Sequence, residues 1–221
     1  MMPKEKKVCE RKILPLSGIN AFSDLPPTEW LDEGIEQEVL EKYQVKVDEA
    51  SNRIVYPVWD NEDNLIGFKG RTRYKNYKEM KIQKYMNYNK IGTTNFFVGM
   101  HENRQDIIKA GEAIIFEGIK SGMKIEGWGY TNWLASETAA LNKDQVVILI
   151  QLGISDVVIA WDNDITLKKV RASVRELKQF VNVYMIQDRT GMLGSPEDKV
   201  SPPDKGRDVW EELYKNKVRI N

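Results

Sequence analysis

The chain has 221 residues, of which 41% are hydrophobic and 30% are charged, and this composition is typical of a folded globular protein. It carries 33 basic and 33 acidic side chains, so a formal net charge of zero provides no overall attraction to nucleic acid. No apolar run approaches the roughly 20 residues that a membrane helix needs, so we expect no membrane-spanning helix.

The N-terminal half predicts an irregular start, two short helices and a β-hairpin. Residues 1–7 are charged and have no apolar stretch behind them, unlike a signal peptide, so we expect a cytoplasmic location. In chain order, the expected segments are an irregular stretch over 1–28, a short helix capped by Thr28 and ended by Gly34, a helix over 36–43, and a hairpin with strands over 53–59 and 65–71. Pro57 favours an edge position for the first strand. Residues 74–95, polar and basic with interleaved tyrosines, predict a loop-rich face.

From residue 111 onward, strands and helices alternate, which predicts a mostly parallel α/β sheet. The expected strands cover 113–116, 131–135, 156–161 and 181–186, and the expected helices cover 120–127, 143–152, 166–180 and 208–215. The predicted fold class is therefore α/β, with an α+β N-terminal subdomain before the parallel sheet. We expect a basic subdomain over 1–110, a catalytic subdomain over 111–195, and a C-terminal loop and helix over 196–221 that completes the site.

Cysteine and histidine are nearly absent, which restricts the metals that this chain can bind. Cys9 and His101 are the only residues of their kinds. A disulfide within the chain and a zinc site of the Cys₄ or Cys₃His kind are therefore excluded. Any metal must be held mainly by carboxylates, which favours hard ions such as Mg²⁺ or Mn²⁺.

Carboxylates follow two of the predicted strands. Glu117 comes directly after one apolar run, and Asp162 and Asp164 come after another. Ligand sites of α/β sheets lie beyond the carboxyl ends of the strands, so these side chains converge if the two strands are neighbours. A divalent cation would relieve their mutual repulsion. Isolated acidic residues after strands are commonly helix caps or loop residues. The interpretation as a metal site therefore depends on the acidic residues occurring together, after two strands of an α/β pattern.

The motifs resemble the Toprim fold, which primases, topoisomerases and some nucleases share. The resemblance rests on residues 116–121 (Phe-Glu-Gly-Ile-Lys-Ser), 134–141 (Leu-Ala-Ser-Glu-Thr-Ala-Ala-Leu) and 158–164 (Val-Ile-Ala-Trp-Asp-Asn-Asp). Upstream, residues 53–60, 66–71 and 84–87 resemble the subdomain that precedes Toprim in DnaG-like primases. Topoisomerases and Toprim nucleases lack that upstream block. The ordered set, over roughly residues 28–212, looks like a DnaG-like primase catalytic core of the phage type.

This resemblance implies an enzyme that makes RNA primers on single-stranded DNA by divalent-metal catalysis, and it implies roles for particular residues. Glu117, Asp162, Asp164 and Asp208 match the metal-binding positions, and the first three are the expected catalytic residues. Arg71, Lys84 and Asn87 match positions that contact nucleotide phosphates or template, and Arg53, Lys69 and Lys90 are weaker candidates. The implied ligands are Mg²⁺ or Mn²⁺, ribonucleoside triphosphates and single-stranded DNA.

The sequence also departs from the cellular pattern. Ser121 stands where cellular primases often have an acidic residue, and Glu33 stands where they often have Arg. The zinc ribbon and the helicase-binding domain of cellular relatives have no counterpart in these 221 residues. We therefore expect a replicative helicase as a partner, and either a separate zinc-ribbon protein as a second partner or a loose choice of start site. Two alternatives stay open at this point: a Toprim-type metal-dependent nuclease, and a non-catalytic nucleic-acid-binding module.

Overall fold

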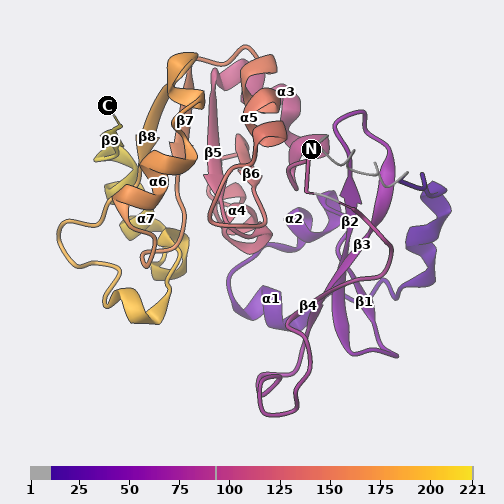
Figure 1. Cartoon of the computed structure of the whole chain (residues 1–221). Helices are drawn as coiled ribbons and strands as arrows, with labels where there is room; N and C mark the ends of the chain where they lie inside the picture. Colours follow the sequence, from indigo (N-terminus) through magenta and orange to yellow (C-terminus); the bar gives the residue numbers. More distant parts are fainter. Residues whose placement is uncertain (1–10, 93, 221) are drawn as a thin grey trace, which may run out of the picture.

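An antiparallel sheet forms the N-terminal half of the structure. The computed structural model describes residues 11–92 and 94–220. The strands β1 (Lys46–Asp48), β2 (Arg53–Trp59), β3 (Leu65–Thr72) and β4 (Tyr85–Asn87) pair in the order β1-β2-β3-β4. The predicted hairpin is the β2–β3 pair, and every residue of β2 is buried. The short helices α1 (Thr28–Asp32) and α2 (Gln37–Lys42) lie between this sheet and the second one (Figure 1).

The second sheet is mostly parallel, which confirms the predicted α/β class. Its order is β6-β5-β7-β8-β9, from β5 (Glu112–Phe116), β6 (Trp133–Ala135), β7 (Asp156–Ile159), β8 (Asn182–Met185) and β9 (Val218–Arg219). The first four strands are parallel, and β9 is antiparallel to β8. The segment after α7 thus returns to pair with the parallel sheet.

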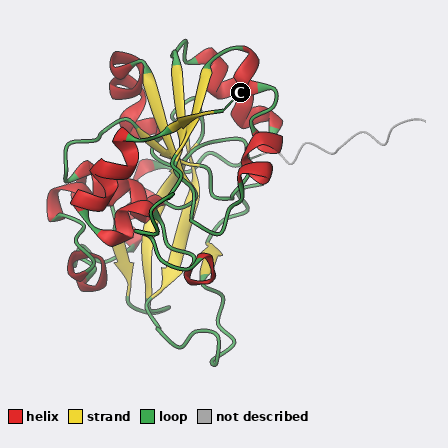
Figure 2. Ribbon diagram, turned by 90° about the vertical axis from the view of Figure 1, so that its left-hand side faces the viewer, coloured by secondary structure: helices red, strands yellow, loops and turns green. Residues whose placement is uncertain are grey.

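Helices cover both faces of the parallel sheet, as Figure 2 shows. They are α3 (Met100–Ala110), α4 (Ile119–Glu126), α5 (Lys143–Gln151), α6 (Leu167–Ser173) and α7 (Arg207–Lys215), with 3₁₀ turns at Leu16–Ala21, Leu177–Gln179, Pro196–Asp198 and Pro202–Lys205. Side chains of β5 alternate between the two faces. Ile114 and Phe116 pack with α4 and α7, whereas Ala113 and Ile115 pack with α3, α5 and α6.

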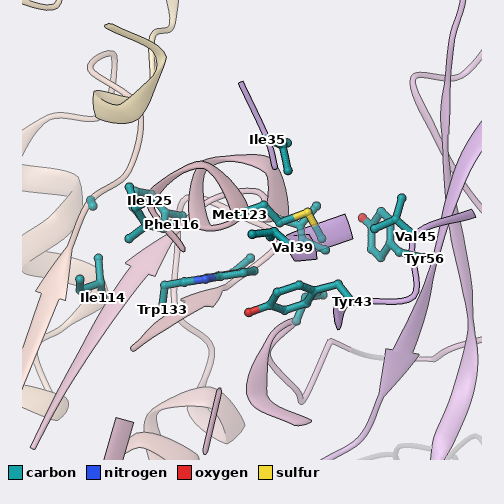
Figure 3. Close-up of a cluster of buried hydrophobic side chains, with 14 of the residues drawn as sticks. Ile35, Val39, Tyr43, Val45, Tyr56, Ile114, Phe116, Met123, Ile125 and Trp133 are labelled. Atoms are coloured by element: carbon teal, nitrogen blue, oxygen red, sulfur yellow. The ribbon is translucent and has the colours of Figure 1, made fainter. Parts of the chain in front are cut away.

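One hydrophobic cluster joins the two sheets, with Trp133 of β6 near its centre (Figure 3). The Trp133 ring lies 5.0 Å from the ring of Tyr43, which follows α2. On the α4 side, Gly122 leaves the space that the indole fills, because a Cβ atom there would lie 2.0 Å from Trp133 Cε3. The core is therefore continuous from the antiparallel sheet, through α2 and α4, to the parallel sheet.

A carboxylate is bonded to both halves beside this core. Glu126 of α4 accepts hydrogen bonds from Trp133 Nε1 at 2.7 Å, from Lys42 Nζ at 2.6 Å and from the Tyr43 hydroxyl. Tyr43 and Lys42 also contact Asn103 Oδ1, at 2.7 and 2.9 Å. Buried charges are tolerated when several donors satisfy them, so this network fixes how α2 meets α4.

Several expected boundaries shift in the structure. Thr28 is the first residue of α1 and not its cap, since Pro27 occupies that position. The helix expected over 166–180 is broken between Ser173 and the 3₁₀ turn at Leu177–Gln179. Helix α3, which the sequence did not predict, lies between two glycines in the left-handed region, Gly99 and Gly111.

The position of Pro57 was predicted only in part. Strand β2 is an inner strand of its sheet, which contradicts an edge strand as a whole. The short β1 pairs with β2 only as far as Val55, however, so Pro57 has a neighbour strand on one side alone, at Phe68. The missing amide donor of proline therefore falls on a side without a strand. In the described part of the chain, no helix has the length and apolar character needed to cross a membrane.

Gly122→Ala tests the joint core. The added methyl group would collide with the buried Trp133 ring, so we expect a loss of about 2 kcal/mol in the free energy of unfolding. Chemical denaturation measures this loss. Lys169→Ala, on the exposed side of α6, is the control and should change stability by less than about 0.5 kcal/mol. A Gly122→Ala variant as stable as the control would show that the ring does not need this space.

Candidate active site

The predicted carboxylates meet at one edge of the parallel sheet because β5 and β7 are neighbours. Ile115 pairs with Ile159 in parallel register. Glu117 follows the end of β5, and Asp162 lies three residues beyond the end of β7. The chain leaves β5 through Gly118, which precedes α4. Both acidic side chains therefore line one cavity beyond the carboxyl ends of the strands.

This cavity, of about 420 Å³, lies between the two sheets. The antiparallel sheet contributes cations and a ring from β3, β4 and the residue before β4, whereas the parallel sheet contributes carboxylates and the start of α4. The lining residues are Lys69, Arg71, Lys84, Tyr85, Glu117, Gly118, Ile119, Lys120, Ser121, Glu137, Asp162, Lys199, Ser201 and Asp204. The joint core thus brings a basic wall opposite an acidic one.

Asp162 is the electrostatic centre of the acidic wall. Burial raises its pKa to about 7, and the negative charges of Glu117, Asp204 and Asp164 act in the same direction. Lys84 opposes the shift. The carboxylates therefore repel one another at neutral pH, and a cation among them would be favoured.

Most cations around the cavity are already paired with carboxylates of the chain. The ion pairs are Lys69 with Glu137, Lys120 with Glu33, Lys124 with Asp204 (2.5 Å) and Lys199 with Asp164 (3.5 Å). Arg71 and Lys84 differ, because among the described residues no carboxylate lies within ion-pair distance of either. These two side chains are thus the cavity cations most available to an anionic ligand.

The remaining sequence-predicted residues lie outside the cavity. Asp208 is exposed in the first turn of α7, and the acidic residue near Asp162 from this segment is Asp204. Asn87 pairs with Lys69 across β3 and β4 and is exposed. Lys90 is exposed beyond β4. Neither Asn87 nor Lys90 lines the cavity, so any role of theirs involves a ligand that extends beyond it.

Arg53 has a structural environment, in contrast to the expectation that it binds nucleotide or template. Its side chain is buried, with 6% exposure. The guanidinium donates to the carbonyl oxygens of Gly70 at 3.3 Å and Gln83 at 3.1 Å. These bonds connect β2, β3 and the segment before β4, so Arg53 supports the basic wall from behind.

The donor set suits a hard divalent ion in chemistry but is not assembled around one point. Carboxylate oxygens are the ligands that Mg²⁺ and Mn²⁺ prefer. Within residues 11–92 and 94–220, however, no three acidic, histidine or cysteine side chains are close enough to hold one ion. Asp164 is turned to Lys199 by their ion pair. Glu117 and Asp162, which share the cavity, are the residues placed to begin a metal site.

Four charged residues that line the cavity were not predicted as site residues, namely Lys120, Glu137, Lys199 and Asp204. Glu137 has a positive φ of 66°, and its amide donates to the Glu117 carbonyl oxygen at 2.9 Å, which holds it beside the strand end. Asp204 accepts from the Ser201 amide at 3.3 Å, within a capping box. A serine three residues before an acidic residue is the sequence signal for such a box.

The raised pKa of Asp162 predicts that this residue destabilises the fold at neutral and alkaline pH. The folded state binds the Asp162 proton up to about pH 7, whereas the unfolded chain loses it near 3.8, so stability falls as the pH rises between these values. Asp162→Asn removes this loss. We expect the variant to be more stable than the parent at pH 8, by roughly 2 kcal/mol, with little difference at pH 3. Thermal unfolding at both pH values checks this, and an equal gain at both would contradict it.

Comparisons with known proteins show which sequences the chain resembles. No protein-family model matches the chain. The SPbeta prophage-derived protein YorJ of Bacillus subtilis is 26% identical over 91% of this chain and 60% of that protein. A DNA primase of Clostridium acetobutylicum is 32% identical over 70% of this chain and 24% of that protein. The chain thus spans less than two thirds of the length of these relatives.

Solved primase structures share the fold. The zinc-binding and RNA polymerase domains of the Aquifex aeolicus primase superpose with a TM-score of 0.72, at 20% identity, over 91% of this chain and 59% of that one. A DnaG catalytic domain bound to single-stranded DNA gives 0.68, at 14% identity, over 92% and 77%. The chain therefore has the fold of the DnaG primase catalytic core and is similar in sequence to DNA primases, which confirms the resemblance that its motifs indicated.

Proposed function

We propose that this chain synthesises short RNA primers on single-stranded DNA during DNA replication, by divalent-metal catalysis. The observation that supports this proposal is that Glu117 and Asp162 share one cavity with Arg71 and Lys84, two cations that have no ion-pair partner among the described residues. This cavity lies on the fold of a DnaG catalytic core. Nucleotidyl transfer requires both walls, because a metal must neutralise the reacting phosphate while cations hold the rest of the polyphosphate.

Mg²⁺ or Mn²⁺ is the proposed cofactor. Glu117, Asp162 and Asp164 would hold it. Asp204 lies near enough for its negative charge to raise the pKa of Asp162. The resemblance gives Asp208 a place in this set, and its exposed position at the start of α7 would require a ligand or a bridging water to connect it. When bound there, such an ion would lower the pKa of an attacking hydroxyl and would neutralise the leaving group.

The basic wall is the proposed phosphate-binding surface. Arg71 can offer paired N–H donors to phosphate oxygens, and Lys84 offers a point charge beside it. Both residues also line a neighbouring hollow of about 260 Å³ that contains Tyr74 and Tyr77. Tyrosine rings are stacking surfaces for bases, so the template or the incoming base would lie there.

The proposed ligands and partners follow from this role. The template is single-stranded DNA, and the substrates are ribonucleoside triphosphates. A replicative helicase would raise template binding through effective concentration, and a zinc-ribbon protein would contribute start-site choice. We place this activity in the cytoplasm, where ribonucleotides and replicating DNA are both present.

Primer synthesis is the direct test. Incubation with single-stranded DNA, labelled ribonucleotides and Mn²⁺ or Mg²⁺ should yield short labelled RNA, because the cavity holds both walls of a nucleotidyl-transfer site. Asp162→Ala/Asp164→Ala should abolish the product. Template degradation without RNA product would instead indicate a Toprim nuclease, and neither reaction, with no Mn²⁺ binding by calorimetry, would indicate a binding module.

Charge removal on the basic wall should separate the cavity cations from those outside it. We expect Arg71→Ala and Lys84→Ala each to lower the rate of primer synthesis at limiting nucleotide by roughly tenfold to a hundredfold, the effect of losing one charged hydrogen bond. Lys90→Ala removes the same charge outside the cavity and should stay within about twofold of the parent. An equal loss in all three variants would mean that general electrostatic attraction, and not this cavity, binds the substrate.

A further inference from the structure

The ion pair between Glu33 and Lys120 lies between the cavity and its neighbouring hollow. Lys120 lines the cavity, and Glu33 lines the hollow. Arg71 and Lys84 line both spaces. The pair therefore stands beside the two unpaired cations and connects α1, in the N-terminal half, with the first turn of α4.

The two members of the pair differ in how tightly they are enclosed. The side chain of Lys120 is 16% exposed and that of Glu33 is 38% exposed. Burial and the nearby charge of Lys124 lower the pKa of Lys120 to about 8, although Asp204 acts in the opposite direction. An anion inside the cavity would stabilise this enclosed ammonium group. Glu33, directly after α1, can turn to solvent at little cost in desolvation.

We infer that Lys120 is a third phosphate-binding residue beside Arg71 and Lys84, and that Glu33 competes with the bound polyphosphate for it. This inference rests on the proposed function and names the side chain that would take over part of the triphosphate. In the free protein the Glu33 carboxylate satisfies Lys120. A polyphosphate entering between the walls displaces that carboxylate, and Lys120 then faces the non-bridging oxygens of the polyphosphate in place of one carboxylate.

A merely structural role for the pair gives different expectations. If the pair only joins α1 to α4, removing either member weakens the joint in the same way and gives no gain in anion affinity. If Glu33 competes, removing its charge strengthens binding, whereas removing Lys120 weakens it. The sign of the Glu33 effect therefore distinguishes competition from bracing.

The test is a double-mutant cycle on the binding of inorganic tripolyphosphate to the full chain, measured by calorimetry at one fixed Mg²⁺ concentration. We expect Glu33→Gln to tighten binding at least threefold and Lys120→Gln to weaken it about tenfold. In the Lys120→Gln background, Glu33→Gln should change affinity by less than a factor of 1.5, because its competitor role needs the lysine.

Glu29→Gln is the matched control. It removes a carboxylate from α1, the helix that Glu33 directly follows. That carboxylate pairs with Arg73 at 2.6 Å and lines the same hollow as Glu33, but it does not line the cavity. We expect unchanged affinity. Thermal unfolding of each variant verifies that it is folded.

The inference is overturned if Glu33→Gln leaves affinity unchanged or weakens it, if its gain persists without Lys120, or if no variant binds tripolyphosphate. The cycle does not require primer synthesis. A chain that makes no primers but shows the expected cycle retains the anion site and refutes the proposed function, whereas primer synthesis with a failed cycle refutes only the role of Lys120.

Discussion

The packing of Trp133 between Gly122 and Tyr43 is the constraint on which the rest of the structure depends. The indole fills space that only a residue without Cβ can leave in α4, and it meets a ring from the N-terminal half at 5.0 Å. Its ring nitrogen is bonded to the same Glu126 carboxylate that Lys42 and Tyr43 contact. Apolar packing and a satisfied buried charge thus act at one point. That point sets the separation of two sheets whose facing edges carry opposite charges.

The separation matters because charge in this chain balances locally as well as globally. Around the cavity, four lysines are matched by four carboxylates, and the excess positive charge is confined to Arg71 and Lys84. On the opposite wall, burial and the negative charges of its acidic neighbours raise the pKa of Asp162. A zero net charge therefore does not describe the site, which is strongly polarised across a few side chains.

The sequence predicted the parallel sheet and its acidic edge well, because both follow from local patterns. Short apolar runs of β-branched residues identified β5 and β7, and strand ends locate ligands in such sheets. Contacts between segments far apart in the chain could not be predicted from these local patterns. An arginine such as Arg53 is usually expected at the surface. Its guanidinium is nevertheless buried, where it donates hydrogen bonds to backbone carbonyl oxygens of β3 and of the loop that follows β3. Asp204 and Asp208 are the same residue type in the same segment, so the sequence does not tell them apart. The 3₁₀ turn at Pro202–Lys205 places Asp204, and not Asp208, in the lining of the cavity.

The continuous core also bears on how such a chain can diversify. Domains that recombine freely are joined where few contacts cross. Here the cluster around Trp133 contains side chains from both sheets, and β9 brings the last described residues back beside β8. An exchange of one half between related chains would succeed only if Gly122, Trp133 and Tyr43 remained matched. We therefore expect the two sheets to be inherited as one unit, whatever is joined to either end.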